Sequence, residues 1–217
     1  LNTSLHIING YTSLLASRLS DDQHDLRNYS GKIQDAAQRL HGTLQKLWLL
    51  LEVDEMAVEE MNKRGSKSDE SCSLEGLIRT VTNEVCGKLH RDVVVSTSIP
   101  DAAVRMSERL AANLLREILE NAFLFSPNKE PVDIGVTVND GTATIEIGDH
   151  GRGLTAATVD GLAAFDAFQR DRFAQRGHGL GLAIVHRILR LCQGSIRITS
   201  TPGKGSIVAL LLPRVVA

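Results

Sequence analysis

Apolar residues recur at steps of three and four along the first quarter of the chain, which predicts two helices over residues 1 to about 55. A run of turn and cap residues, Ser-Asp-Asp-Gln at 20–23, separates them. The second helix carries a single apolar stripe, made of Ile33, Ala37, Leu40, Leu44, Leu47 and Leu51. Because a hairpin of two helices buries such a stripe only in part, a dimeric four-helix bundle is the expected arrangement.

A polar stretch separates this hairpin from the rest of the chain. The sequence turns polar from Ala57 to Ser71, and residues 63–70 include no apolar side chain. Such composition is typical of linkers between domains. It predicts a helical hairpin over residues 1–58, a linker over 59–72 and a second domain over 73–217.

Helical and alternating patterns follow one another beyond the linker, which predicts an α+β domain. They indicate a helix over 74–85, a strand from residue 92, a helix capped by Ser107, a β-hairpin over 132–147, a helix over 180–192, and strands on either side of 202–205. The overall fold class is therefore α+β, with the helical hairpin first.

Composition gives no support to several classes of partner. The 217 residues are 42% hydrophobic and 23% charged, with a formal net charge of -2, which gives no electrostatic reason to expect nucleic acid or an acidic membrane as the main partner. No apolar run approaches the roughly 18 residues of a membrane span. The three cysteines are far apart, without zinc or disulfide spacing, which fits a reducing cytosol. A cytoplasmic location is expected, with a membrane reached only through upstream regions.

Two polar residues share one face of the helix that follows Ser107. Glu117 and Asn121 are four positions apart on an otherwise apolar helix. An amide oxygen there can ligate Mg²⁺, and a carboxylate can orient or deprotonate a nucleophile. Taken alone, the pair also fits an ordinary solvated helix face.

Two segments with glycines adjoin the predicted strands. Asp-His-Gly-Arg-Gly at 149–153 follows the strand that ends at Ile147. A carboxylate there can accept a hydrogen bond from an exocyclic amine, and the glycines let the backbone close over a flat ring. Thr-Pro-Gly-Lys-Gly-Ser at 201–206 predicts a tight turn between the last two strands. Each segment alone also fits a plain turn.

A third glycine-rich segment, Gly-His-Gly-Leu-Gly-Leu at 177–182, opens the helix over 180–192. Free N–H groups and the positive end of the helix dipole suit this position to phosphates. No strand precedes it, so it is not the dinucleotide fingerprint, and it lacks the Gly-Lys-Ser/Thr of a P-loop. A flexible loop is the alternative.

These four motifs, in this order, resemble the catalytic domain of sensor histidine kinases, within the wider superfamily of gyrase and Hsp90-type ATPases. Residues 73–217 are similar to that domain, an α/β sandwich, and residues 1–55 resemble the dimerisation and histidine-phosphotransfer hairpin. The resemblance implies a homodimeric kinase that binds ATP and Mg²⁺. It further implies transfer of the γ-phosphoryl group to a histidine on the hairpin, and then to the receiver domain of a response regulator.

The resemblance also implies a role for individual residues. Glu117 is expected to polarise the nucleophile, Asn121 to bind Mg²⁺, and Asp149 to bind the adenine amino group. The other residues expected to bind the nucleotide are Gly151, Gly153, Leu154, Gly177, His178, Gly179, Leu180, Gly181 and Ser206.

The beginning of the chain departs from the family pattern. The phosphoacceptor motif, roughly His-Glu-Leu-Arg-Thr-Pro-Leu, fits only from its third position, at Leu1. The phosphoacceptor is then expected two residues before Leu1, and the chain is expected to be a fragment cut from a longer protein. His6 is the alternative within the chain, although it lies on a different part of the helix.

A second departure follows Asn121. The family often carries Lys-Tyr there, with the lysine on phosphate, whereas this chain has Leu124 and Phe125. A cation is therefore missing, and the arginines of the expected lid, Arg170, Arg172 and Arg176, are candidates to supply it.

Two other functions stay open. The first is a dimeric scaffold that docks a response regulator and has a weak or regulatory nucleotide site, which the substitution at Leu124 favours. The second is another ATPase of the superfamily, which hydrolyses ATP or phosphorylates a serine on an anti-sigma partner. The helical hairpin disfavours the second.

Overall fold

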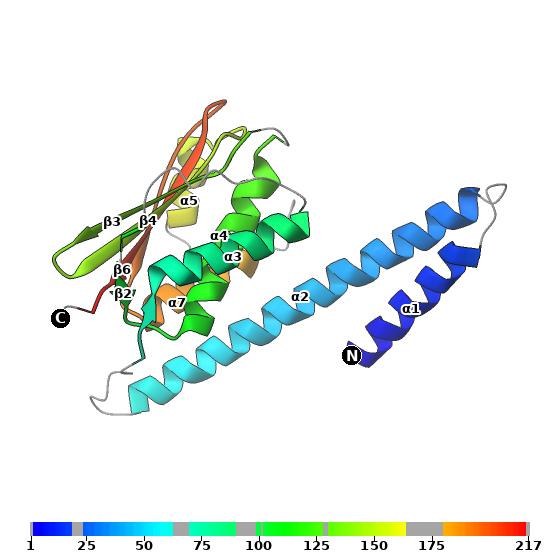
Figure 1. Cartoon of the computed structure of the whole chain (residues 1–217), viewed down its shortest axis with the longest axis horizontal. Helices are drawn as coiled ribbons and strands as arrows, with labels where there is room; N and C mark the ends of the chain where they lie inside the picture. The colour runs from blue at the N-terminus through cyan, green and yellow to red at the C-terminus, as the bar shows by residue number, and fades with distance from the viewer. Residues whose placement is uncertain are drawn as a thin grey trace. The chain divides into compact units, whose positions relative to one another are not determined.

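The computed structural model describes residues 2–18, 24–62, 70–89, 99–100, 102–127, 130–163 and 180–215 (Figure 1). The chain divides into two compact units, Leu1–Leu51 and Glu52–Ala217. The first is helical and the second combines helices with an antiparallel sheet. The predicted α+β class is confirmed.

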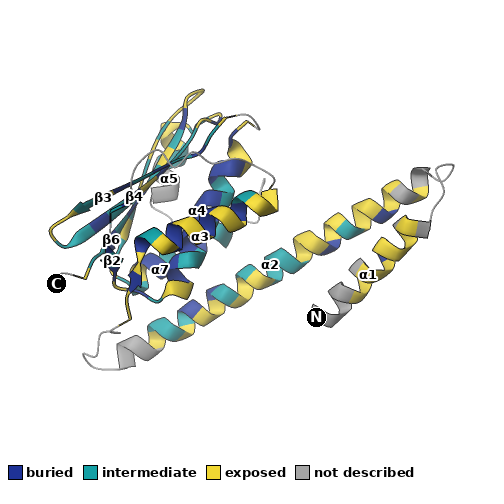
Figure 2. Cartoon of the chain, in the orientation of Figure 1, coloured by how far each residue is buried: buried dark blue, intermediate teal, exposed yellow. Residues whose placement is uncertain are grey.

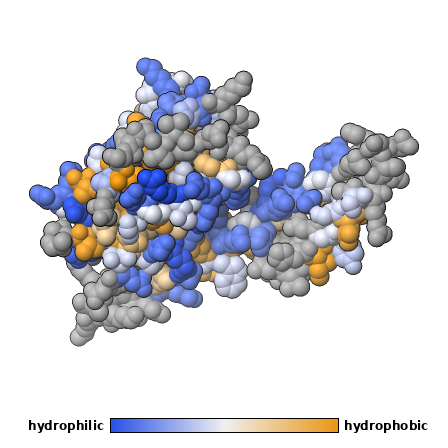
Figure 3. Space-filling view, in the orientation of Figure 1, coloured by the Kyte–Doolittle hydropathy of each residue, from blue (hydrophilic) through white to orange (hydrophobic). Residues whose placement is uncertain are grey.

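The first unit is a hairpin of α1 (Asn2–Arg18) and the first part of α2 (His24–Asn62). The hydroxyl of Ser30 donates a 2.6 Å hydrogen bond to the carbonyl of Thr12, and both residues are buried between the helices. Most large apolar side chains of the unit nevertheless face outward, as the exposed faces in Figure 2 and the orange atoms in Figure 3 indicate. As predicted, two helices alone leave the stripe on α2 largely uncovered: Ile33, Leu40, Leu47 and Leu51 are exposed.

Helix α2 continues beyond its predicted end. It runs to Asn62, into the segment that the sequence assigned to the linker. Residues 56–62 are rich in good helix formers and contain neither proline nor glycine, so their polarity does not end the helix. From Glu52 onward the helix belongs to the second unit: Val53 is buried there, and Glu52 pairs with Arg109 at 2.6 Å.

The second unit contains a four-stranded antiparallel sheet in the order β3 (Asp133–Asn139), β4 (Thr142–Asp149), β6 (Gly205–Pro213) and β5 (Ser195–Thr201). Both predicted hairpins are confirmed, β3–β4 and β5–β6. Alternate residues point to one face, where Ile145, Ile147, Leu210 and Leu212 are almost completely buried.

Helices α3 (Leu74–Leu89), α4 (Glu108–Phe125) and α7 (Leu180–Leu191) supply the other side of this core (Figure 1). α4 packs on β4 and α7 packs on β5. The hydroxyl of Ser107 accepts a hydrogen bond from the N–H of Leu110, which confirms the predicted N-cap. Leu114 and Ile118 of α4 and Ile184 of α7 are fully buried, so the helix positions rest on apolar packing.

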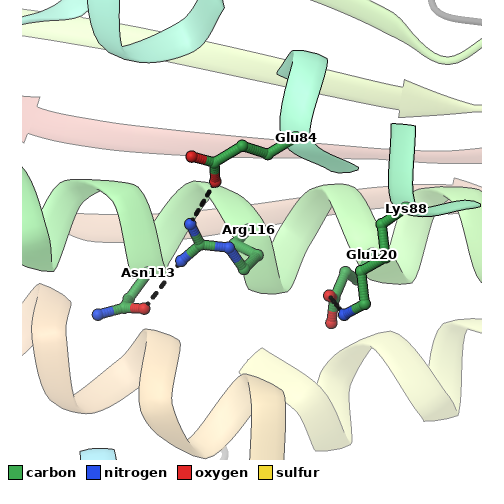
Figure 4. A network of polar contacts seen from close by, with 5 residues as sticks. All are labelled: Glu84, Lys88, Asn113, Arg116 and Glu120. Atoms are coloured by element: carbon green, nitrogen blue, oxygen red, sulfur yellow. Dashed lines mark hydrogen bonds and ion pairs between the residues drawn. The ribbon is translucent and has the colours of Figure 1, made fainter. Parts of the chain in front are cut away.

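Ion pairs join the outer surfaces of α3 and α4 (Figure 4). Arg116 bridges Glu84, at 2.7 Å, and Asn113, at 3.0 Å, and Lys88 pairs with Glu120 at 2.8 Å. Because these groups are solvated, each pair is worth at most about 1 kcal/mol. They link α3 to α4, the helix that carries the candidate site.

Some elements were not predicted. The sequence did not reveal α5 (Ala156–Ala163), nor the short pair of β1 (Cys72–Ser73) and β2 (Ala103–Val104). Two-residue strands are too short to show alternation. The strand predicted from residue 92 lies outside the described residues. Among the helices that the structure describes, none is long and apolar enough to cross a membrane.

Candidate functional site

One face of α4 aligns the two polar residues singled out in the sequence. Glu117, Asn121 and Phe125 follow one another at steps of four, so they form a single row along the helix. Glu117 is only 6% exposed, and Asn121 is half-buried. A charged residue at a core-like position lowers stability unless it has partners, and such positions are typical of functional sites.

The first turn of α7 meets this row at Glu117. Gly181 is so close that a methyl group on it would lie 2.5 Å from Oε2 of Glu117 and 3.7 Å from Nδ2 of Asn121. Glycine therefore lets the N-terminal end of α7, where a helix attracts anions, approach two oxygen-bearing side chains. The structure brings together the first and third sequence motifs at this point.

The loop after β4 meets the other end of the row. The Oδ1 atom of Asp149 accepts a 2.8 Å hydrogen bond from the N–H of Gly151, which holds the carboxylate at the end of the strand. A methyl group on Gly151 would lie 2.3 Å from the carbonyl oxygen of Phe125. The N–H of His150 also donates to the hydroxyl of Ser126, the C-cap of α4, at 3.3 Å. The loop is thus packed directly on the end of α4.

The turn between β5 and β6 supports the same loop from the opposite side. Asp149 is the register partner of Ser206. Gly153 has a positive φ of 63°, and a methyl group on it would lie 2.0 Å from the carbonyl oxygen of Thr201. A methyl group on Gly205, φ 99°, would lie 1.9 Å from the carbonyl oxygen of Asp149. The second and fourth motifs are therefore in contact, and glycine is required on both sides.

Ser200 is a site residue that the sequence did not reveal. Its hydroxyl accepts a hydrogen bond from the N–H of Leu154 at 2.7 Å and donates to the carbonyl of Gly205 at 2.9 Å. It also lies 3.0 Å from the hydroxyl of Ser206. Ser200 thus ties the loop to the turn. A serine inside an alternating strand carries no pattern that would distinguish it.

The described part of the chain thus places most of the predicted site residues together, at Glu117 and Asn121, at 149–154, at Leu180 and Gly181, and at Ser206. Leu154 and Leu180 are half-buried. Gly177, His178 and Gly179 lie outside the described residues, as do Arg170, Arg172 and Arg176.

The oxygen donors fit a cation held jointly with phosphates. Within the described residues, no group of three or more His, Cys, Asp or Glu side chains could hold a metal ion. Mg²⁺, however, is commonly bound by one or two protein oxygens, with phosphate oxygens and water completing its shell. The Glu117 carboxylate and the Asn121 amide group lie beside the N-terminal end of α7, where phosphates bind favourably.

Comparison with known proteins agrees with this geometry. Residues 106–216, which make up about half of the chain and include Glu117, Asp149, Gly181 and Ser206, match the family of histidine kinase-, DNA gyrase B-, and HSP90-like ATPases. The chain belongs to this family. Its second unit is thus an ATPase-family domain, for which the family implies ATP binding.

Curated sensor proteins resemble the chain over nearly all its length. The heme sensor protein HssS of Staphylococcus saprophyticus is 24% identical over 216 residues, 99% of this chain and 45% of the relative. The sensor-like histidine kinase SenX3 of Mycobacterium tuberculosis is 29% identical over 221 residues, 95% of this chain and 50% of the relative. The chain therefore spans about half the length of the curated relatives it matches.

The fold of both units together also occurs in a solved structure. Full-length ShkA in complex with AMPPNP matches with a TM-score of 0.68 at 20% identity, over 99% of this chain and 44% of that one. The two units thus share their fold with ShkA over nearly the whole length of the chain.

Proposed function

We propose that the chain is the core of a two-component histidine kinase, which binds Mg-ATP in its second unit and transfers the γ-phosphoryl group to a histidine. The observation that carries the proposal is the convergence of four sequence motifs on one site. The row on α4, the loop after β4, Gly181 and the β5–β6 turn all meet there. The accepting histidine is proposed to lie on the hairpin, upstream of Leu1, and a response regulator receiver domain accepts the group next.

The proposed roles of the site residues follow from the chemistry at each end of the row of Glu117, Asn121 and Phe125 on α4. The Asp149 carboxylate accepts a hydrogen bond from the adenine amino group, while Gly151 and Gly153 let the loop lie close to the ring. At the other end, Asn121 ligates Mg²⁺ and Glu117 orients or polarises the attacking imidazole. When bound, Mg²⁺ neutralises charge on the phosphates. Phosphoryl transfer depends mainly on such positioning and charge stabilisation.

The first unit is proposed to form a homodimer through the exposed stripe on α2. Ile33, Leu40 and Leu47 are 51%, 50% and 36% exposed and lie seven residues apart, as in the seam of a helical bundle. A second copy would cover them and complete a four-helix bundle. A single chain leaves this apolar stripe exposed to water, which is the reason to expect the dimer. A cytoplasmic location is part of the proposal.

The dimer can be tested by sedimentation equilibrium. The chain is expected to have the mass of two copies at micromolar concentration. Ile33→Glu with Leu40→Glu should raise the dissociation constant by at least about a hundredfold, because carboxylates would be buried without partners. Gln38→Glu, on an exposed position away from the stripe, serves as the control and should leave the mass unchanged. A monomer at every concentration would contradict the proposed dimer.

Nucleotide binding is tested by titrating the chain with a non-hydrolysable ATP analogue, with and without Mg²⁺. Micromolar, Mg²⁺-dependent binding is expected. Asp149→Asn should weaken binding of the analogue by about ten- to a hundredfold, because it removes a hydrogen bond to a charged group. Asn121→Ala should remove most of the dependence on Mg²⁺. Thermal unfolding of each variant shows whether the fold is intact.

The alternative outcome supports a different function. If neither the chain nor its variants bind the analogue, the ATP-dependent kinase proposal is wrong. The dimeric scaffold that docks a response regulator would then be the better conclusion. It is favoured by Leu124, a 68% exposed apolar residue at a position where the resemblance leads us to expect a lysine.

A further inference from the structure

His150 joins the loop after β4 to β3, the edge strand of the sheet. Its ring Nε2 atom lies 2.8 Å from Oδ2 of Asp133, the first residue of β3. An ionised carboxylate only accepts hydrogen bonds, so the Nε2–H group of the imidazole is the donor. The two side chains are 46% and 43% exposed. The pair therefore lies at the surface of the sheet and is not part of the buried core.

The backbone of His150 is held as well. Its N–H donates to the hydroxyl of Ser126, the C-cap of α4, at 3.3 Å. The hydrogen bond from the N–H of Gly151 to Oδ1 of Asp149 spans His150, as in an Asx-turn. The direction of the Asp149 carboxylate thus depends on the backbone angles of the residue that follows it. By contacting β3 and α4, His150 restricts these angles.

The contact with β3 completes the support of the loop. β4 lies between β3 and β6 in the sheet, so the loop after it has a neighbour on each side. On the side of β5 and β6, the hydroxyl of Ser200 accepts a hydrogen bond from the N–H of Leu154. On the side of β3, His150 contacts Asp133. A carboxylate on a loop held from both sides loses little freedom when it binds a ligand, which increases affinity.

We propose that His150 is a positioning residue, which through Asp133 fixes the Asp149 carboxylate and so determines how well the site distinguishes purines. This inference rests on the proposed ATP binding and on the role proposed for Asp149. An exocyclic amino group donates to a carboxylate, whereas a carbonyl oxygen at the same place is repelled by it. Because hydrogen bonds depend steeply on distance and angle, a loosely held carboxylate discriminates less between the two. His150 itself contacts no part of the nucleotide in this proposal.

The test compares ADP with inosine diphosphate, which has a carbonyl oxygen in place of the amino group, by calorimetric titration. The wild-type chain should bind ADP at least about tenfold more tightly. His150→Ala should weaken ADP binding by about two- to fivefold, the effect of losing a solvated pair, and should leave inosine diphosphate almost unchanged. Asp133→Ala should do the same. The double variant should lose no more than either single variant, because each breaks the same contact.

His150→Gln is the conservative variant. Its amide nitrogen can take the place of Nε2 and donate to Asp133, so it should keep most of the preference for ADP. Glu146→Ala, at an exposed position of β4, removes a carboxylate elsewhere on the same sheet and should leave both affinities unchanged. Midpoints of thermal unfolding, measured for all variants, separate a loss of binding from a loss of the fold.

The outcomes separate this inference from the proposed function. An equal loss for both nucleotides in His150→Ala would mean that His150 acts on a part common to them, and would overturn the inference. An unchanged preference for ADP in that variant would also overturn it, while ATP binding itself stands. Equal binding of both nucleotides by the wild-type chain would contradict the inference and the role of Asp149. If the wild-type chain binds neither, the proposed ATP binding and this inference are both wrong.

Discussion

Gly205→Ala is expected to lower the free energy of unfolding by about 3 kcal/mol or more, and to abolish binding of an ATP analogue. Gly205 opens β6 with a φ of 99°, a conformation that a residue with a side chain rarely adopts. A methyl group there would also lie 1.9 Å from the carbonyl oxygen of Asp149 and 3.0 Å from Cα of His150. These are backbone atoms at the paired end of β4 and the first residue after it, so they cannot move aside alone.

The loss of binding follows from the same contact. To admit the methyl group, the end of β4 must separate from β6, where Asp149 pairs with Ser206. Asp149 would then leave its position beside Gly151. Thermal unfolding should show a midpoint lower by about 10 °C, the change that 3 kcal/mol produces in a domain of this size.

Gly203→Ala is the matched control in the same turn. Gly203 also has a positive φ, 77°, but a methyl group on it would meet nothing within 4 Å. The variant should lose only the cost of the left-handed conformation, about 1 to 2 kcal/mol, and should still bind the analogue. Equal destabilisation in the two variants would show that the contact with Asp149 does not matter and that φ alone determines the effect.

Gly181→Ala is expected to weaken analogue binding by about a hundredfold or more, with almost no change in stability. The methyl group would lie 2.5 Å from Oε2 of Glu117, the far end of a flexible side chain that can rotate away. Rotation spares the fold, and alanine favours a helix by up to about 1 kcal/mol over glycine. It nevertheless displaces the carboxylate and places a methyl group at the end of α7 where phosphates would approach.

Gly181→Ala is informative because it is expected to change the binding of the analogue without changing the stability of the fold. Binding is measured by titration and stability by thermal unfolding. Gly76→Ala, in α3 and with nothing within 4 Å of the added methyl group, should leave binding unchanged. In a Glu117→Ala background, the further loss caused by Gly181→Ala should be smaller if displacement of the carboxylate is part of the cause. Normal binding by Gly181→Ala would contradict the placement of phosphates at this helix end.

The order and type of the main elements could be predicted from the sequence because they depend on local periodicity. The alternation along β3 and β4, the tight connection between them and the cap at Ser107 each involve residues close together in the chain. The same holds for Glu117 and Asn121, whose spacing places them on one face of any helix. The predicted end of α2 is too early, because a polar composition does not end a helix and helix formers continue to Asn62.

The assembly of the site could be predicted only in outline, through resemblance to a family. Which glycines are required depends on atoms far away in the sequence: Gly181 meets Glu117, Gly151 meets the carbonyl of Phe125, and Gly205 meets that of Asp149. The spacing between motifs contains no information on such distances.

By itself, the sequence determined the α+β class, the helical stripes, both hairpins and the residue types able to bind a nucleotide, because each depends on neighbouring residues. Only the tertiary structure decided that Ser200 ties the loop to the turn and that Arg152 lies over Phe125. These contacts form when sheet and helices pack into one core, which brings together side chains that no local pattern relates.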